Sequence, residues 1–260
     1  MILRSITRHV RDQNWFAVGL DFVIVVIGVF IGIQVANWNE ERQNRALADD
    51  YLDRLTTDLV TEQALWERAI DYFGTARAYG LEALDGFDRP TETLDEGFLA
   101  AVYQASQIWF VAPNRATFDE LQSTGRITLI DDPVLRTALA NHYLRSAQTG
   151  VTLQQNSQYR RIARLYLDQQ VQGEVRARCG DRWITDDSNF YYVELPEACA
   201  IELPADLVDR EIALIYANDE VKRELRFHLS VLDANLGVMR NTREIAAKTV
   251  ERLRAHREKR

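Results

Sequence analysis

The chain has 260 residues, a formal net charge of −8, and only 12 glycines and 5 prolines. So few turn-forming residues argue against a loop-rich or all-β fold, and the acidic balance disfavours nucleic-acid binding, which begins with a basic face. We therefore expect an all-α protein without a nucleic-acid partner.

The most prominent feature of the sequence is the segment WFAVGLDFVIVVIGVFIGIQVANWN at residues 15–39. A helix of about 20 apolar residues crosses a hydrocarbon core of about 30 Å, whereas in a water-soluble domain it would have to be buried on every side. We therefore predict one transmembrane helix over residues 15–39, surrounded by the lipid bilayer. Residues 1–14 then form a short amphipathic arm at the cytoplasmic surface, and residues 40–260 form a single extramembrane helical domain.

Polar and small residues of this segment fall on one narrow stripe when the chain turns by about 100° per residue. The stripe, with the valine beside it, consists of Asn14, Asp21, Val25, Gly28, Gly32 and Asn39. Its seven-residue period is typical of helices that pack against copies of themselves, and a Gly-x-x-x-Gly pair lets two backbones approach closely in lipid. The stripe therefore predicts homo-oligomerisation through this face. Two alternatives are that Asp21 extends to the headgroup region while the glycines are incidental, or that Asp21 lines a water-filled pore.

The charges on the two sides of the segment predict its orientation. Arg4, Arg8 and Arg11 precede it, whereas Glu40 and Glu41 balance the arginines that follow it. An excess of basic residues on the short leading side predicts a cytoplasmic N-terminus and a domain across the membrane, in the periplasm. A cleaved signal peptide has a similar order of basic and apolar residues. The apolar run is longer than is usual there and lacks a clear small-x-small cleavage site, which favours an uncleaved signal anchor.

Downstream of the segment, apolar residues follow a helical period without a break to about residue 87. This period predicts one helix that continues from the membrane into the extramembrane domain and bends or frays near Gly74 and Gly80. A polar connection and a shorter helix over residues 95–106 follow. The apolar run at residues 108–111 is expected to be buried.

Local capping signals predict the next two helices. Thr117 and Glu120 have the spacing of a capping box, in which the two side chains accept hydrogen bonds from free backbone amides, and Gly125 is suited to end that helix. Asp132, followed by a proline, is typical of another helix start. The apolar period predicts that this helix continues to about Val171.

The C-terminal third begins with an irregular loop over residues 173–206, with a short hairpin near residues 190–194. Helices are predicted over residues 206–217 and 220–254, and the second carries leucines at helical spacing. The complete prediction is an all-α fold, in which an N-terminal transmembrane helix runs into a long helix. A bundle of long antiparallel helices with one irregular, cysteine-containing loop follows.

The two cysteines, Cys179 and Cys199, both lie in this predicted loop. In an oxidising periplasm they would form a disulfide and close a loop, which stabilises a fold by about 3 kcal/mol in chain-entropy estimates. Free buried thiols are the alternative. A metal site is disfavoured because structural zinc sites take four ligands and no histidine lies near either cysteine. We predict a disulfide and no metal site.

The sequence contains no recognisable catalytic or cofactor-binding motif. Its histidines have neither HExxH spacing nor a cysteine partner, and Gly-x-Ser-x-Gly, phosphate-binding and dinucleotide-binding glycine motifs are absent. His142 and His228 lie among helical apolar residues, where a structural histidine with satisfied hydrogen bonds is more common than a catalytic one. We therefore expect no catalytic residues, no cofactor and no enzymatic activity.

Two stretches resemble a known group of proteins. NWFAVGL with the following VIGVFIGIQVANWNEER, and STGRITLIDDPVLRTAL at residues 123–139, are similar to two recurrent stretches of a large group of uncharacterised bacterial single-span inner-membrane proteins, known as a domain of unknown function. The resemblance implies a membrane-anchored helical architecture in a bacterial inner membrane. It implies no activity and no site residues.

Together these patterns favour a non-enzymatic scaffold or assembly protein that is anchored in the membrane and self-associates. One alternative is an oligomeric ion channel lined by Asp21, Gly28 and Gly32. Another is a periplasmic sensor or accessory subunit that binds a membrane or periplasmic partner protein.

Overall fold

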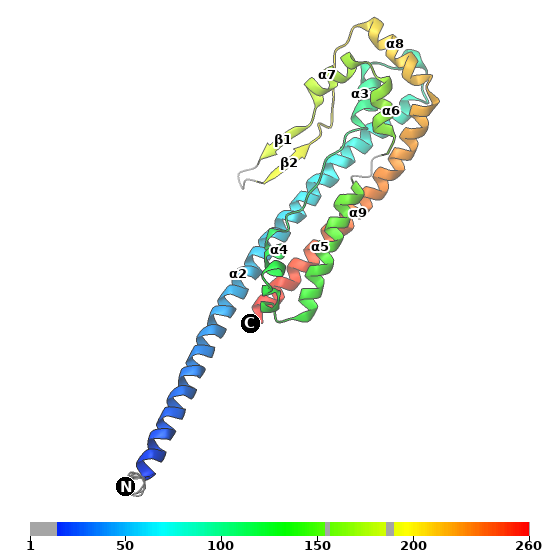
Figure 1. The fold of residues 1–260 in the computed structure, drawn as a ribbon. Helices are drawn as coiled ribbons and strands as arrows, with labels where there is room; N and C mark the ends of the chain where they lie inside the picture. Colours follow the sequence, from blue (N-terminus) through cyan, green and yellow to red (C-terminus); the bar gives the residue numbers. More distant parts are fainter. Residues whose placement is uncertain (1–14, 154–156, 186–189, 260) are drawn as a thin grey trace, which may run out of the picture. The chain divides into compact units, whose positions relative to one another are not determined.

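A computed structural model describes residues 15–153, 157–185 and 190–259, and this part of the chain is mostly helical (Figure 1). Its elements in chain order are α2 (Trp15–Gly86), the 3-10 helix η1 (Thr91–Thr93), α3 (Glu96–Gln104), α4 (Ala116–Ser123), the 3-10 helix η2 (Arg126–Leu129), α5 (Pro133–Leu153), α6 (Tyr159–Tyr166), α7 (Gln169–Cys179), β1 (Arg182–Thr185), β2 (Tyr191–Glu194), α8 (Ala205–Tyr216) and α9 (Asp219–Glu258). The predictions of a mostly helical chain and of one long apolar N-terminal helix are confirmed.

The first long helix, α2, is a single helix of 72 residues that contains the predicted transmembrane segment and the helix after it. It continues through Gly74 and Gly80, so the predicted fraying at these glycines is wrong. The chain packs as two units, residues 1–51 and residues 52–260. In the first unit, every residue from 19 to 46 is exposed.

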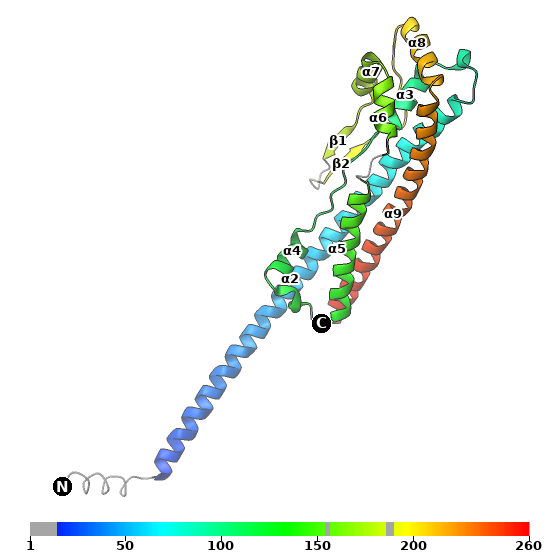
Figure 2. The same ribbon diagram turned by 45° about the vertical axis from the view of Figure 1, so that its right-hand side comes forward.

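The second unit is built around the part of α2 that begins at Leu52, with α5 and α9 beside it (Figure 2). This part of α2 buries one face because apolar residues recur along it at three-, four- and seven-residue steps. The largest of its buried side chains include Leu52, Leu55, Leu59, Trp66 and Tyr72. Helices α6 and α8 both contact α9, and α3 packs against α6, α7 and α8.

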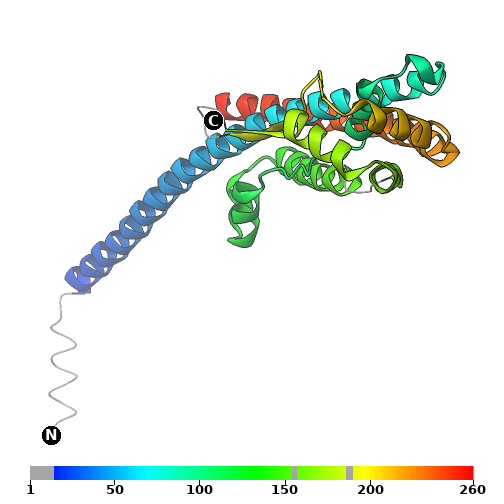
Figure 3. The same ribbon diagram turned by 90° about the horizontal axis from the view of Figure 1, so that it is seen from above.

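The helices α2 and α9 run antiparallel, as the opposite order of their ribbon colours shows in Figure 3, and the ion pairs between them follow the same direction. Residue numbers rise along α2 and fall along α9 by equal steps in the series Asp53–Arg257, Glu67–Arg243, Arg77–Asp233 and Asp88–Lys222, whose last member follows α2 directly. A single register therefore holds over the whole contact. Exposed ion pairs contribute only about 0–1 kcal/mol each, so they mark this register while the buried apolar residues supply most of the stability.

Several predicted helix ends are confirmed. Asp95 Oδ1 accepts a hydrogen bond from the backbone N–H of Gly97 at the start of α3, at 3.0 Å. Asp132 Oδ1 accepts one from the N–H of Val134 at the start of α5, at 2.8 Å. Gly125 has a φ of 70°, in the left-handed region that closes the α4 turn.

The predicted capping box and the predicted burial of the whole run 108–111 are wrong. The helix α4 begins at Ala116, whose N–H donates to Asn114 Oδ1 at 3.0 Å, so Thr117 lies inside the helix. Glu120 forms an ion pair with Arg54 at 2.5 Å instead of capping the backbone. In the run 108–111, Trp109 and Val111 are buried, but the Phe110 side chain is 66% exposed.

The region after α5 also differs from its prediction. One helix to Val171 was expected, but α5 ends at Leu153 and two shorter helices, α6 and α7, follow it. Asp168 begins α7 because its Oδ1 accepts a hydrogen bond from the N–H of Gln170 at 2.7 Å. The expected irregular loop therefore starts only after Cys179. The short hairpin is confirmed, because β1 and β2 pair antiparallel from Arg182 opposite Glu194 onwards.

Candidate functional site

The predicted oligomerisation residues lie on one exposed face of α2. Asp21, Val25, Gly28, Gly32 and Asn39 are all exposed, and we call this set the N-terminal face. A Cβ atom added to Gly28 or Gly32 would meet no heavy atom within 4 Å, so the glycines leave room for another backbone to approach. The sixth predicted member, Asn14, lies outside the described residues.

The helix around this face exposes an unusual amount of apolar surface. All the large apolar side chains from Leu20 to Val35 are between 48% and 68% exposed. Complete burial of one such side chain stabilises a protein by about 1.5–3 kcal/mol, so this stretch gains on the order of 10 kcal/mol or more by leaving water. It is long and apolar enough to cross a membrane, and none of its apolar window is buried in the protein.

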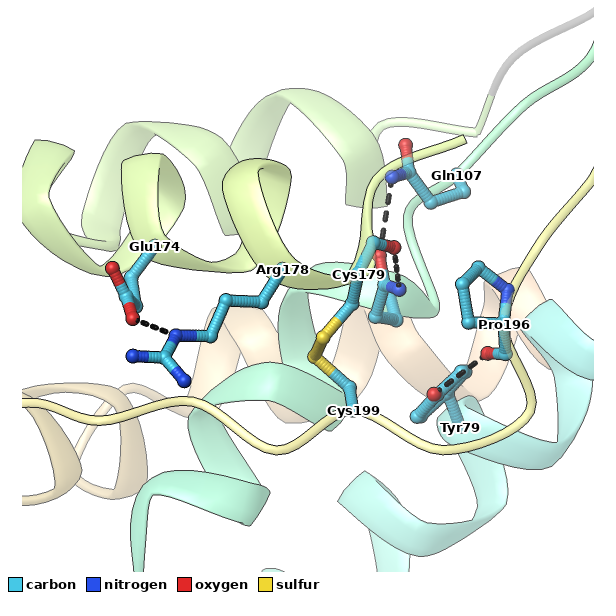
Figure 4. The surroundings of a disulfide bond; sticks show 8 residues. Tyr79, Gln107, Glu174, Arg178, Cys179, Pro196 and Cys199 are labelled. Atoms are coloured by element: carbon cyan, nitrogen blue, oxygen red, sulfur yellow. Dashed lines mark hydrogen bonds and ion pairs between the residues drawn. A yellow bond between two sulfur atoms is a disulfide. The ribbon is translucent and has the colours of Figure 1, made fainter. Parts of the chain in front are cut away.

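The two cysteines, Cys179 and Cys199, are joined by a disulfide with their Cα atoms 5.4 Å apart (Figure 4). Cys179 is the last residue of α7, and its carbonyl accepts a hydrogen bond from Gln104 Nε2 at 2.8 Å. Cys199 lies in the segment between β2 and α8. This segment is also held at Pro196, whose carbonyl accepts a hydrogen bond from the Tyr79 hydroxyl at 2.8 Å. The disulfide therefore fastens this segment to α7, and α2 and α3 hold its two sides.

A group of polar side chains is completely buried between α2 and α5. Glu62 is 2% exposed, and its Oε1 accepts hydrogen bonds from Trp66 Nε1 at 2.9 Å and from Ser146 Oγ at 2.5 Å. His142 Nε2 lies 2.9 Å from Glu62 Oε2. We call these four residues the Glu62 network.

The chemistry of the Glu62 network is structural. In a nucleophile–base pair the serine hydroxyl is hydrogen-bonded to the imidazole that takes its proton. Here Ser146 donates to Glu62, and the imidazole of His142 is bonded to the same carboxylate. Both serine and histidine are almost fully shielded from solvent, so no substrate reaches them.

The second buried histidine, His228, has a partner on each ring nitrogen, whereas His142 Nδ1 has none among the described residues. His228 Nε2 lies 2.8 Å from the carbonyl oxygen of Ala105, and its Nδ1 lies 2.6 Å from Ser157 Oγ. The Tyr159 ring stacks on the imidazole with centroids 5.1 Å apart. Burial lowers the pKa of His228. The neutral form fits both contacts, with Nε2–H as the donor and Nδ1 as the acceptor.

A surface groove between α2 and the hairpin has a volume of about 880 Å³. Acidic and basic side chains line it in similar numbers, among them Arg68, Asp71, Arg182, Glu194, Glu197 and Arg240. The described residues contain no group of three or more His, Cys, Asp or Glu side chains that could hold a metal ion. No local sequence pattern marks this groove, because its lining comes from α2, the hairpin and α9.

Comparison of the chain with models of protein families, with curated proteins and with solved structures finds no match. The resemblance to single-span bacterial proteins stays a prediction.

Proposed function

We propose that α2 anchors the protein in a bacterial inner membrane and that the protein is a non-enzymatic scaffold that self-associates through the N-terminal face. The observation that carries the proposal is the combination of Asp21, Gly28 and Gly32 on one exposed side of an apolar helix. A lipid-facing carboxylate costs about 2.5–3.5 kcal/mol at the bilayer centre. A second copy of the same helix would relieve this cost and fill the space above the glycines.

The proposed topology has a cytoplasmic N-terminus and a periplasmic domain. The arginines that precede the apolar segment support it, and so does the Cys179–Cys199 disulfide, since structural disulfides persist in oxidising compartments. Protease added to spheroplasts should degrade the domain, whereas protease added to inside-out vesicles should leave it intact. The opposite pattern would invert the topology.

Cysteine cross-linking in native membranes tests the self-association. Both native cysteines are bonded to each other, so an introduced cysteine is the only free thiol. Val35 lies within about 20° of Gly28 around the helix, and Val26 lies about 180° from Val35. Val35→Cys should form a covalent dimer under mild oxidation, and the matched Val26→Cys variant should not. Equal cross-linking at both positions, or at neither, would contradict association through this face.

An ion channel is the second candidate, and Asp21 is the observation that favours it. It is the only charged residue in the segment 15–39. If the associated helices surround an aqueous lumen, Asp21→Asn should change cation conductance in a reconstituted bilayer. A flat current record for the unsubstituted protein at every voltage would exclude the channel and leave the scaffold.

A further inference from the structure

Four arginines on α6 and α7 gather without forming ion pairs. Arg160, Arg161, Arg164 and Arg176 make no salt bridge with any carboxylate in the described part of the chain, although the protein as a whole carries a net charge of −8. By contrast, Arg178, two residues after Arg176, pairs with both Glu174 and Glu202. We call these four residues, Arg160, Arg161, Arg164 and Arg176, the arginine cluster.

The inner guanidinium groups are fixed by neutral partners. Arg160 Nη1 donates to the carbonyl oxygen of Ser106 at 2.5 Å. Arg164 Nη2 donates to Gln107 Oε1 at 2.9 Å, and its guanidinium lies over the ring of Tyr103, 4.6 Å from the centroid. Each guanidinium has five N–H donors, so several remain to donate to a ligand. The contacts to Ser106, Gln107 and Tyr103 already hold the two guanidinium groups in place.

Arg176 also approaches Tyr103, because its Nη1 lies 3.4 Å from the Tyr103 hydroxyl. Burial lowers the pKa of Arg164, and the charges of Arg160 and Arg176 lower it further. One carboxylate, that of Asp181, acts against these charges, and burial raises its own pKa. The cluster therefore holds like charges in a partly desolvated place with little compensation, an arrangement that a bound anion would stabilise.

The cluster opens to solvent in a shallow surface depression of about 500 Å³. Its lining consists of Ser157, Arg160, Arg161, Arg164 and Leu165. Leu165 is 66% exposed and forms an apolar edge beside the cationic floor. A guanidinium group can donate two short, parallel hydrogen bonds to two oxygens of one phosphate group.

We propose that this depression binds the phosphate group of an organic phosphate, with the organic part against Leu165. Two sources share this chemistry: a soluble phosphate ester and the headgroup of an anionic phospholipid. The proposal concerns the extramembrane unit alone and is independent of self-association through the N-terminal face.

Calorimetric titration of the full chain in a neutral maltoside detergent tests the site, with sn-glycerol 3-phosphate as the first probe at constant ionic strength. The unsubstituted protein should bind it saturably with one site per chain. Arg161→Gln removes a cluster charge that makes no hydrogen bond to another described residue, and we expect Kd to rise about tenfold. Arg178→Gln is the matched control, because Arg178 is already paired with carboxylates, and it should leave Kd unchanged.

A second variant, Arg161→Gln/Arg164→Gln, should abolish binding, with helical circular dichroism as the check that it is folded. Absence of saturable binding by the unsubstituted protein would overturn the proposal. So would an equal Kd for the unsubstituted protein and Arg161→Gln.

Dihexanoyl phosphatidic acid, with dihexanoyl phosphatidylcholine as its zwitterionic control, distinguishes the two sources. Binding about tenfold tighter than that of glycerol 3-phosphate, and lost in Leu165→Ser, would identify a lipid headgroup as the ligand. Equal binding of the two phosphates would identify a soluble ester.

Discussion

Replacing Glu62 by alanine should destabilise the second unit, which begins at Leu52, more than almost any other single truncation of a polar side chain. The carboxylate is 2% exposed and serves three partners: Trp66 Nε1 at 2.9 Å, Ser146 Oγ at 2.5 Å and His142 Nε2 at 2.9 Å. Glu62→Ala leaves all three without an acceptor in an interior that water does not reach.

The expected magnitude follows from these contacts. An orphaned buried donor costs about 1–3 kcal/mol, and Glu62→Ala orphans the donors of Trp66 and His142. Because Ser146 is able to rotate toward another acceptor, we expect a loss of about 4 kcal/mol for Glu62→Ala. Glu62→Gln keeps the shape and one accepting oxygen, so about half of this loss is expected.

Equilibrium unfolding of the full chain in maltoside with guanidinium, followed by tryptophan fluorescence and circular dichroism, measures the effect. Glu67→Ala is the matched control on the same helix. Its carboxylate pairs with Arg243 at the surface, so its removal should cost less than about 1 kcal/mol. A loss for Glu62→Ala no larger than that for Glu67→Ala would refute the assignment of the Glu62 network as a structural unit.

Two further predictions concern pH and close packing. Burial lowers the pKa of His228, so below pH about 6.5 the unfolded chain binds a proton that the folded chain does not. The free energy of unfolding should therefore fall as the pH decreases through this value. Unfolding midpoints at pH about 7.5 and about 5.5 measure this loss of stability. A Cβ added to Gly86 would lie 2.5 Å from Phe98 Cδ2, so Gly86→Ala should destabilise by about 1–3 kcal/mol in the same unfolding assay. Gly74 has open space around it, and Gly74→Ala should stabilise the helix by up to about 1 kcal/mol.

Controls make both predictions decisive. His228→Gln cannot titrate and should show a smaller loss of stability between the two pH values; an identical loss would assign the pH dependence to other groups. If Gly86→Ala and Gly74→Ala change stability by the same amount and in the same direction, the close approach of Phe98 to α2 is wrong.

The features that local sequence predicts are those determined by neighbours a few residues away. The helical period predicted α2, and Asp132 marked a helix start because an aspartate accepts from amides two residues on. The N-terminal face was likewise predicted from the sequence, since residues seven apart share a side of any helix. Placing these residues on one face required no knowledge of contacts with the rest of the fold.

The features that were missed depend on distant contacts. The capping box failed because Asn114 supplies the cap and Glu120 pairs with Arg54, which lies on another helix. The arginine cluster depends on Arg160 reaching Ser106 at the end of α3, a contact between residues 54 apart in sequence. No local pattern distinguishes an arginine that will lack a counter-charge from one that will pair.

The mass of the detergent-extracted particle tests the central claim, that the protein assembles through the N-terminal face. Light scattering with detergent correction should give a defined oligomer for the unsubstituted chain and a monomer for Gly28→Leu/Gly32→Leu. Gly19→Leu is the matched control, because Gly19 lies about 180° from Gly28 and a Cβ there also meets nothing within 4 Å. It should keep the oligomer. A monomeric unsubstituted particle, or an oligomer that survives Gly28→Leu/Gly32→Leu, would contradict the account.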